Sequence, residues 1–195
     1  MLIIIRGGGD LATGVALRLY RSGMDVVICE TAVPTSIRRT VCFSEAARLE
    51  EMMVEGVTAR RAVPEEVPAL LAAGIIPVLV DPEGACIPGL RPDAVVDAIL
   101  AKRNLGTSMD MAPIVVAAGP GFTAGVDCHA AVETMRGHYL GRVIYEGSPL
   151  PNTNIPGLIG GYAGERVLRA PADGVFAGAK RIGDRVEAGD VAGYV

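Results

Sequence analysis

Three consecutive glycines, Gly7 to Gly9, and an acidic residue further along the chain are the residues best suited to bind a ligand. The glycines follow an apolar run that starts at Leu2, and with Ala12 they match the GxGxxA pattern of dinucleotide-binding βαβ units. Glu30 comes twenty-one residues after Gly9, close to the spacing of the acid that binds an adenosine ribose. The pattern predicts a diphosphate site at a helix amino terminus. A glycine turn that only packs a helix onto a sheet is the alternative.

Each residue of this loop has a physical reason to be a candidate. Gly7 can take the positive φ of a tight turn, and Gly9 has no Cβ to keep backbone N–H groups away from a diphosphate. The expected cofactor-binding residues of the loop and its helix are Gly7, Gly8, Gly9, Asp10, Ala12 and Thr13, with Glu30 as the ribose-binding acid.

A second glycine-rich turn follows the apolar run from Ile114 to Ala118. We expect a helix to begin near Thr123, so that its amides attract an anion at the same sheet edge as the first loop. A loop that only makes a close contact between helix and strand is the alternative. The candidate binding residues here are Gly119, Gly121, Phe122 and Thr123.

Asp127 and His129, within this expected helix, are candidates for proton transfer because imidazole titrates near neutral pH. Helical spacing would place His129 and Glu133 on one face, where Cys128 or His138 could complete a zinc site. No HExxH or CxxC motif supports such a site, and we predict no metal ligands.

Charge and composition exclude several classes of partner. The net charge is −4, the eighteen Lys and Arg residues are scattered, and five Tyr, three Phe and no Trp offer no stacking platform, so no nucleic acid is expected. No apolar run approaches the length of a membrane span, and no signal peptide is recognisable. We therefore expect a cytoplasmic protein. Its cysteines, without CxxC spacing, are expected to be buried thiols: Cys29, Cys42, Cys86 and Cys128.

The elements that must position these residues follow from apolar runs. Continuous rather than alternating runs indicate strands buried on both faces, as in a parallel sheet. Strands are expected at 2–5, 26–29, 76–80, 94–96, 114–118 and, more weakly, 142–145, and helices at 13–22, 43–55 and 64–73. Residues 93–103 fit a strand or a helix, and we favour a strand because β-branched residues are consecutive there. The alternation predicts an α/β, doubly wound, Rossmann-like parallel sheet.

The character of the chain changes after Glu146. We expect a nucleotide-binding domain at 1–147, a glycine- and proline-rich linker at 148–165, and short antiparallel strands at 166–195, where apolar pairs alternate with DG and GD turns. Such a short β segment cannot close its own core, so it would pair with the main domain, another copy or further residues.

Several stretches, in order, carry a resemblance to a known family: RGGGDLATGVALRLYRSG, RRTVCFSEA, VVDAILAKRN, GPGFTAGVDCHAAVETMRGHYLGRVI, PNTNIPG and RVLRAPADGVF. Together they resemble the accessory proteins of selenium-dependent molybdenum hydroxylases, over nearly the whole chain. The resemblance implies a cytoplasmic factor in the maturation of enzymes related to xanthine dehydrogenase. It marks the loop from Gly7 to Gly14 and the stretch from Gly119 to His129 as family motifs, and assigns them no chemistry. The family also looks distantly similar to xanthine dehydrogenase maturation factors.

The tail from Arg169 to Val195 is similar to the first half of a biotinyl or lipoyl-type barrel-sandwich domain. The chain stops at Val195 before any lysine hairpin that could carry a prosthetic group, so this similarity supports no carrier role. Family members continue further, which would make this chain a shortened form.

Three functional hypotheses follow. The first is an accessory factor that binds NAD or a molybdenum cofactor dinucleotide through the first loop, with molybdenum hydroxylase subunits as partners. The second is an NAD-dependent oxidoreductase, although no YxxxK motif is present. The third is a protein-interaction scaffold without a ligand. A homodimer is a further expected assembly.

Overall fold

The computed structural model describes residues 1–195 and divides them into two compact units, Met1–Asn152 and Thr153–Val195. The first unit contains a nine-stranded, mostly parallel sheet, and the second contains a two-stranded antiparallel sheet. The predicted α/β class is confirmed.

The first unit begins with β1 (Leu2–Arg6), α1 (Asp10–Arg21) and β2 (Asp25–Glu30), as the sequence predicts. The remaining elements of the sheet unit are α2 (Ala46–Leu49), β3 (Glu51–Val54), β4 (Val57–Ala62), α3 (Val67–Ala72), β5 (Ile76–Val80), α4 (Ile87–Leu90), β6 (Ala94–Asp97), β7 (Ile114–Ala118), β8 (Ala130–Val132) and β9 (Val143–Ile144). Short 3-10 turns occur at Arg39–Val41, Phe43–Glu45, Pro64–Glu66 and Met109–Met111.

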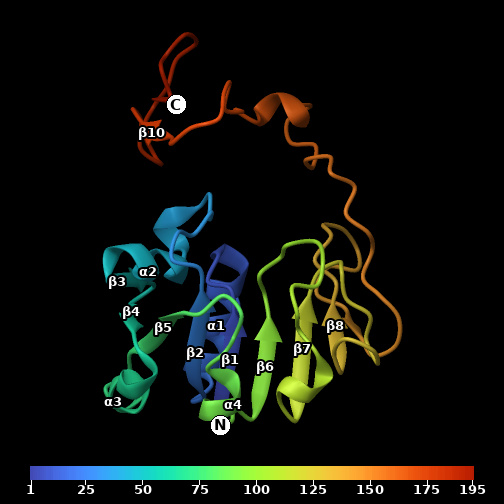
Figure 1. The fold of residues 1–195 in the computed structure, drawn as a ribbon. Coiled ribbons are helices and arrows are strands. Elements are labelled where there is room, and N and C mark those ends of the chain that lie inside the picture. Colours follow the sequence, from blue (N-terminus) through green and yellow to red (C-terminus); the bar gives the residue numbers. More distant parts are fainter. The chain divides into compact units, whose positions relative to one another are not determined.

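The strand order across the sheet is β3-β4-β5-β2-β1-β6-β7-β8-β9 (Figure 1). All neighbouring pairs from β4 to β8 are parallel, and only the outer strands β3 and β9 pair antiparallel. From β1 the chain passes to β2 and then to the β3–β4 hairpin at the edge of the sheet. β5 takes the place between β4 and β2, and the chain then returns to the other side of β1 with β6. The carboxyl edge between β1 and β6 is therefore a topological switch point, where open α/β sheets bind ligands.

Separate apolar clusters cover the two faces of the sheet. On one face Ile3 and Ile5 of β1 pack with Ala12 and Ala16 of α1 and with Phe43. On the other face Ile4 packs with residues that include Val67 of α3, Ile87 of α4 and Phe122. Because the inner strands are buried on both sides, their apolar runs are continuous rather than alternating.

The helix predicted over 43–55 is wrong in its second half. The helical part ends at Leu49, Glu50 has a positive φ of 69°, and the chain continues into the β3–β4 hairpin. Glu55 and Gly56 form its two-residue turn with φ values of 49° and 78°. Positive φ at both turn residues is the property of the type I′ hairpin turn, and pairing with β4 prevails over the helix propensity of Glu51 to Val54.

The second unit contains a 3-10 turn at Gly164–Arg166 and strands β10 (Ala177–Gly178) and β11 (Gly193–Tyr194). Nearly all of its residues are exposed, so it has little core of its own. The resemblance of this tail to half of a barrel-sandwich domain stays a prediction. No helix in either unit has the length and apolarity needed to cross a membrane.

Candidate functional site

Gly7 and Gly8 are required by the fold itself. Gly7 has a φ of +93°, and a Cβ there would lie 2.8 Å from the Cα of Ile99, in the loop after β6. A Cβ on Gly8 would lie 2.8 Å from the amide nitrogen of Ser44. The Gly8 carbonyl accepts a hydrogen bond from that same amide, so the loop is held tightly between two neighbouring backbones.

Gly9 differs from the two glycines before it. Its φ of −64° and ψ of −178° suit any L-residue, and a Cβ there would contact only Ser36 Oγ, at 3.5 Å. Gly9 is the N-cap of α1 and makes no side-chain cap bond, and the amides of Gly9, Asp10, Leu11 and Ala12 donate to no protein acceptor. Neither backbone strain nor packing explains a glycine at this position. The first turn of α1 therefore offers free N–H groups beside open space, which is the arrangement that binds anions.

Glu30 ends β2 next to the glycine loop. Its Oε2 accepts the Gly8 amide at 2.8 Å and its Oε1 accepts the Thr31 amide at 2.7 Å. These bonds fix the carboxylate at the sheet edge and leave each oxygen with further acceptor capacity. The structure thus brings together the loop and the acid that the sequence paired, in a position where ribose hydroxyls could donate to the acid.

The other predicted residues of the loop have different surroundings. Ala12 and Thr13 are buried, and the Thr13 hydroxyl donates to the Gly8 carbonyl and accepts the Phe43 amide. Both residues therefore support the loop rather than contact a ligand. Asp10 lies in the first turn of α1 and pairs with Arg38 at 2.5 Å. This ion pair offsets the repulsion that a free carboxylate would exert on an anion there.

A pocket of about 300 Å³ opens at the carboxyl ends of the central strands. We call it the edge pocket. Its lining residues end or follow β1, β2, β5 and β6, and they are Gly7, Cys29, Glu30, Thr31, Pro82, Glu83, Ile99, Leu105 and Gly106. The pocket therefore lies at the switch point of the sheet, beside the predicted ribose-binding acid.

Arg6, at the end of β1, holds two of the loops that line the edge pocket in place through hydrogen bonds to their backbone carbonyls. Its guanidinium donates to the carbonyls of Pro82 and Leu105, both at 3.0 Å, and to the hydroxyl of Thr107. Thr107 in turn donates to Asp97 at 2.6 Å, and Arg6 Nη1 lies 3.7 Å from Asp97. Arg6, Thr107 and Asp97 are all buried. Sequence reasoning missed this network, because its members are far apart in the chain.

The second glycine-rich segment does not lead into a helix, and that prediction is wrong. Gly119, Gly121 and Gly125 all have positive φ, and residues 122–128 fold across one face of the sheet before β8 pairs directly with β7. A Cβ on Gly121 would lie 2.5 Å from the Cα of Arg103, so this glycine permits a close contact between loops. Phe122 is buried in the core, and the Thr123 amide already donates to Asp127 Oδ2 at 2.7 Å.

Asp127 and His129 have structural partners. Asp127 closes its own turn and also accepts a 3.3 Å hydrogen bond from Asn104. His129 Nδ1 accepts the amide of Val115, near the start of β7, and therefore lies towards the amino edge of the sheet, opposite the glycine loop. Glu133 is not on a shared helix face with His129, because Ala130–Val132 is a strand. The carboxylate of Glu133 is buried and accepts two backbone amides.

The cysteines divide into two groups. Burial raises the pKa of Cys42 and of Cys128, each of which is a separate buried thiol. Cys29 and Cys86 instead lie together, with their sulfurs 3.5 Å apart. The hydrogen bond with Cys86, burial and the nearby charges of Cys86 and Asp81 raise the pKa of Cys29, while the Arg6 charge acts to lower it.

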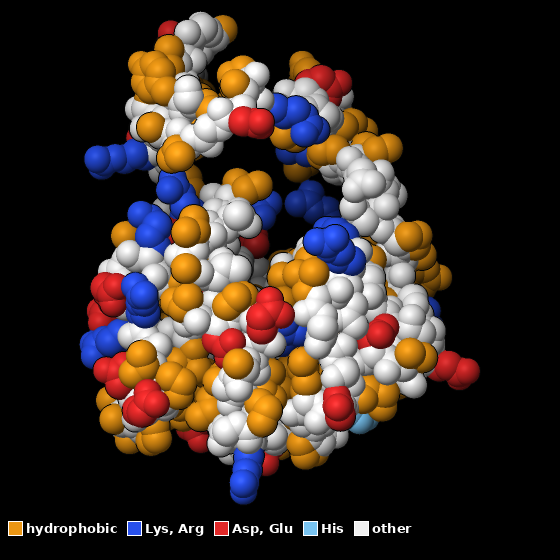
Figure 2. Space-filling view, in the orientation of Figure 1, with side chains coloured by type: hydrophobic (Ala, Val, Ile, Leu, Met, Phe, Trp, Pro, Cys, Tyr) orange, Lys and Arg blue, Asp and Glu red, His pale blue; other side chains and the backbone are white.

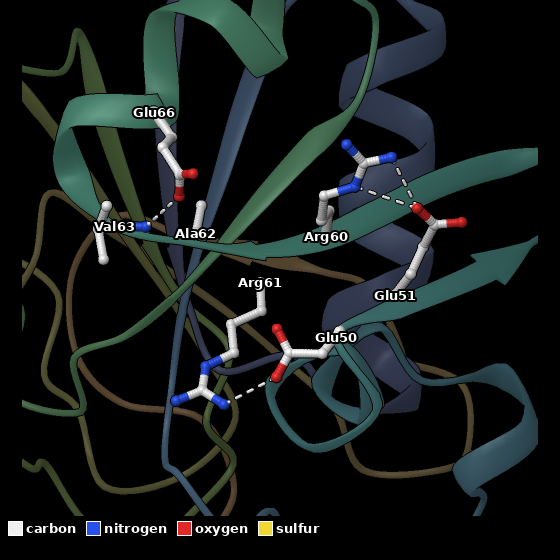
Figure 3. Close-up of a pocket in the computed structure, with 7 residues that line it drawn as sticks. All are labelled: Glu50, Glu51, Arg60, Arg61, Ala62, Val63 and Glu66. Carbon is white, nitrogen blue, oxygen red and sulfur yellow. Dashed lines mark hydrogen bonds and ion pairs between the residues drawn. The ribbon is translucent and has the colours of Figure 1, made fainter.

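A second pocket, of about 450 Å³, lies at the end of β4. Figure 3 shows that its charged side chains are paired: Arg60 with Glu51, Arg61 with Glu50, and Glu66 with the Val63 amide. Each of these charged side chains therefore already has a partner within the protein. Figure 2 likewise shows acidic and basic side chains interspersed on the viewed face of the first unit.

Comparison with known proteins finds a relative that aligns with the whole chain. The chain is 53% identical to an uncharacterized protein, YqeB, of Escherichia coli strain K12, over all 195 residues. It spans 36% of the length of that relative. No family model matches the chain, and no solved structure matches it.

Proposed function

We propose that this chain is a nucleotide-binding module that holds a dinucleotide at the Gly7–Gly9 loop, in a Rossmann-type, doubly wound sheet. The order β5-β2-β1-β6-β7-β8, all parallel, supports this fold assignment because it is the order of dinucleotide-binding sheets. The diphosphate would lie against the first turn of α1, and the ribose hydroxyls would donate to Glu30.

The observation that carries the proposal is the contrast between Gly9 and its neighbours. Gly7 and Gly8 are needed by the backbone, whereas Gly9 has an ordinary φ and open space beside it. Its missing side chain leaves room above four amides without protein acceptors. NAD and a molybdenum cofactor dinucleotide share the diphosphate that such a loop would bind.

The biological setting of this binding is the maturation of a molybdenum hydroxylase. The resemblance of the ordered motifs to accessory proteins of selenium-dependent molybdenum hydroxylases supports it, and it gives the hydroxylase subunits as partners in the cytoplasm. Asp127 and His129 bond within the fold, so the proposed role is binding and delivery of a cofactor rather than hydride transfer.

Gly9→Val tests the proposal, because its side chain would lie at the proposed diphosphate position, and its Cβ would have only Ser36 Oγ within 4 Å, at 3.5 Å. Loss of two charge-assisted hydrogen bonds, at ~1.5–3 kcal/mol each, predicts a fall in dinucleotide affinity of about 100-fold or more. Isothermal titration calorimetry with NAD and with cytidine diphosphate measures the loss, and circular dichroism confirms the fold. Gly14→Ala, on the exposed side of α1, is the matched control. Unchanged affinity in Gly9→Val would refute the proposal.

A further inference from the structure

Two cysteines and an aspartate converge at the carboxyl edge of the sheet. Cys29 lies near the end of β2, Asp81 directly follows β5, and Cys86 precedes α4. One ligand atom from each of the three lies within 4.8 Å of the others. β2 and β5 are parallel neighbours, with Cys29 opposite Leu79, and this pairing brings together residues that are 57 positions apart.

We propose that Cys29, Asp81 and Cys86 form a binding site for a thiophilic divalent cation, of which Zn²⁺ is the representative. Thiolates are preferred ligands of zinc, and a carboxylate oxygen completes an S₂O donor set of the kind that leaves a fourth position open. The donors come from the end of β2 and from the single loop between β5 and α4, so the pairing of β2 with β5 positions the site.

The sulfur separation fits a tetrahedral ion. With Zn–S bonds of about 2.3 Å, sulfurs 3.5 Å apart subtend an angle of ~100° at the metal, close to the tetrahedral value of about 109°. A linear two-coordinate ion with bonds of the same length would require sulfurs ~4.6 Å apart. The geometry therefore favours a tetrahedral divalent ion over a linear one.

Asp81 is oriented towards this role by its loop. Its Oδ1 accepts the Ala85 amide at 2.9 Å and its Oδ2 accepts the Cys86 amide at 2.8 Å. These bonds fix the carboxylate beside the two sulfurs, as outer hydrogen bonds fix the ligands of known metal sites. Asp81 and Cys86 are partly exposed, so an ion can enter from solvent.

Charge balance also fits. Binding would release one proton from each thiol, and a divalent ion with two thiolates and one carboxylate carries a net charge of −1. The positive charge of the buried Arg6 acts to lower the pKa of Cys29. The Nε–H of Arg6 is buried and has no hydrogen-bond partner. The Arg6 Nε atom lies close to the loop from Asp81 to Cys86, because a Cβ built on Gly84 of that loop would be 3.7 Å from Arg6 Nε. The guanidinium thus supplies a positive charge next to an anionic metal–thiolate group.

The fourth position connects this site with the edge pocket. Cys29 lines the edge pocket and is also one of the three proposed ligands, with Asp81 and Cys86. A water molecule or a sulfur or oxygen atom of a molecule in the pocket would complete the tetrahedron. The proposal does not depend on dinucleotide binding, because its ligands lie outside the Gly7–Gly9 loop.

Zinc titration of the full chain, kept reduced with a phosphine, tests the site against a chromophoric competitor chelator. We expect one Zn²⁺ per chain, and Co²⁺ in its place should show a sulfur-to-metal charge-transfer band. Cys86→Ser should lower zinc affinity by more than ~100-fold, because loss of a ligand exceeds the 10–100-fold effect typical of outer-sphere changes. Asp81→Asn should lower it by at least about tenfold.

Cys42→Ser is the matched control, because Cys42 is also buried and a serine there can keep the hydrogen bond to the Arg38 carbonyl. It should bind zinc as the wild type does, as should Gly9→Val, which separates this site from dinucleotide binding. Zinc binding that persists in Cys86→Ser would overturn the proposal. A reduced wild type that binds no zinc would overturn the proposal as well. If mild oxidation then lowers the mass of that protein by two hydrogens, Cys29 and Cys86 form a redox pair instead of a metal site.

Discussion

Replacing Gly7 by alanine should destabilise the sheet unit strongly, because two independent costs meet at this position. The φ of +93° is unfavourable for any L-residue with a side chain. The new Cβ would also lie 2.8 Å from the Cα of Ile99 and 3.0 Å from the carbonyl oxygen of Ala98. These neighbours are backbone atoms and cannot turn aside as a flexible side chain can.

The backbone around Gly7 has little freedom to relax. The Gly7 amide donates to the Cys29 carbonyl at 2.8 Å, and the Ala98 amide donates to the Arg6 carbonyl at 2.9 Å. An unfavourable backbone conformation costs ~1–3 kcal/mol, and overpacking costs about 1–3 kcal/mol more. We therefore expect the free energy of unfolding to fall by roughly 2–6 kcal/mol, a large part of the ~5–15 kcal/mol that stabilises a typical domain.

Urea unfolding followed by circular dichroism measures this change. Gly14→Ala is the internal comparison, because a Cβ there has no neighbour within 4 Å and Gly14 lies inside α1. In a helix interior this change should raise stability by about 0.5–1 kcal/mol. If Gly7→Ala unfolds within ~0.5 kcal/mol of the wild type, the described packing of the glycine loop against the loop after β6 is incorrect.

Two further substitutions test the edge pocket. Arg6→Met removes the buried partner of Asp97 and the donor to two loop carbonyls. It should lower the free energy of unfolding by about 3–5 kcal/mol. A loss below ~1 kcal/mol in urea unfolding would contradict the buried network. Glu30→Gln should weaken dinucleotide affinity by roughly tenfold, since hydrogen bonds to a charged acceptor are replaced by weaker ones, and should weaken pyrophosphate binding less, through the lost bond to the Gly8 or Thr31 amide alone. Calorimetry with the dinucleotide and with pyrophosphate measures both affinities. An equal fall of the two affinities in Glu30→Gln would exclude ribose recognition by Glu30.

Local patterns in the sequence were sufficient to predict the first βαβ unit. The boundaries of β1 and β2 follow from apolar runs that end in glycine or in a charged residue, and Glu30 lies beside the loop because adjacent parallel strands end at one edge. The same reasoning failed after Leu49 and after Ala118. In both places a helix-compatible composition was overridden by tertiary pairing, with β4 in the first case and with β7 in the second.

The thiol–carboxylate cluster could not be found from spacing. Cys29 and Cys86 come together only because β5 pairs with β2, and no local motif specifies that strand order. The Arg6 network has the same origin, since Thr107 and Asp97 reach Arg6 through the neighbouring position of β6. The β3–β4 hairpin also lacked a strong local signal, because Glu55–Gly56 is not one of the Asn-Gly, Asp-Gly or Gly-Gly pairs typical of type I′ turns.

The most direct test of dinucleotide binding at the glycine loop is the identification of what the protein carries. The chain is purified from its own host, denatured, and the released small molecules are identified and quantified by mass spectrometry, in parallel with Gly9→Val. A dinucleotide or a pterin dinucleotide released near one per chain from the wild type, and absent from Gly9→Val, is the predicted result. Equal amounts of such a molecule from both proteins, or none from a wild type that also fails to bind added dinucleotide, would contradict it.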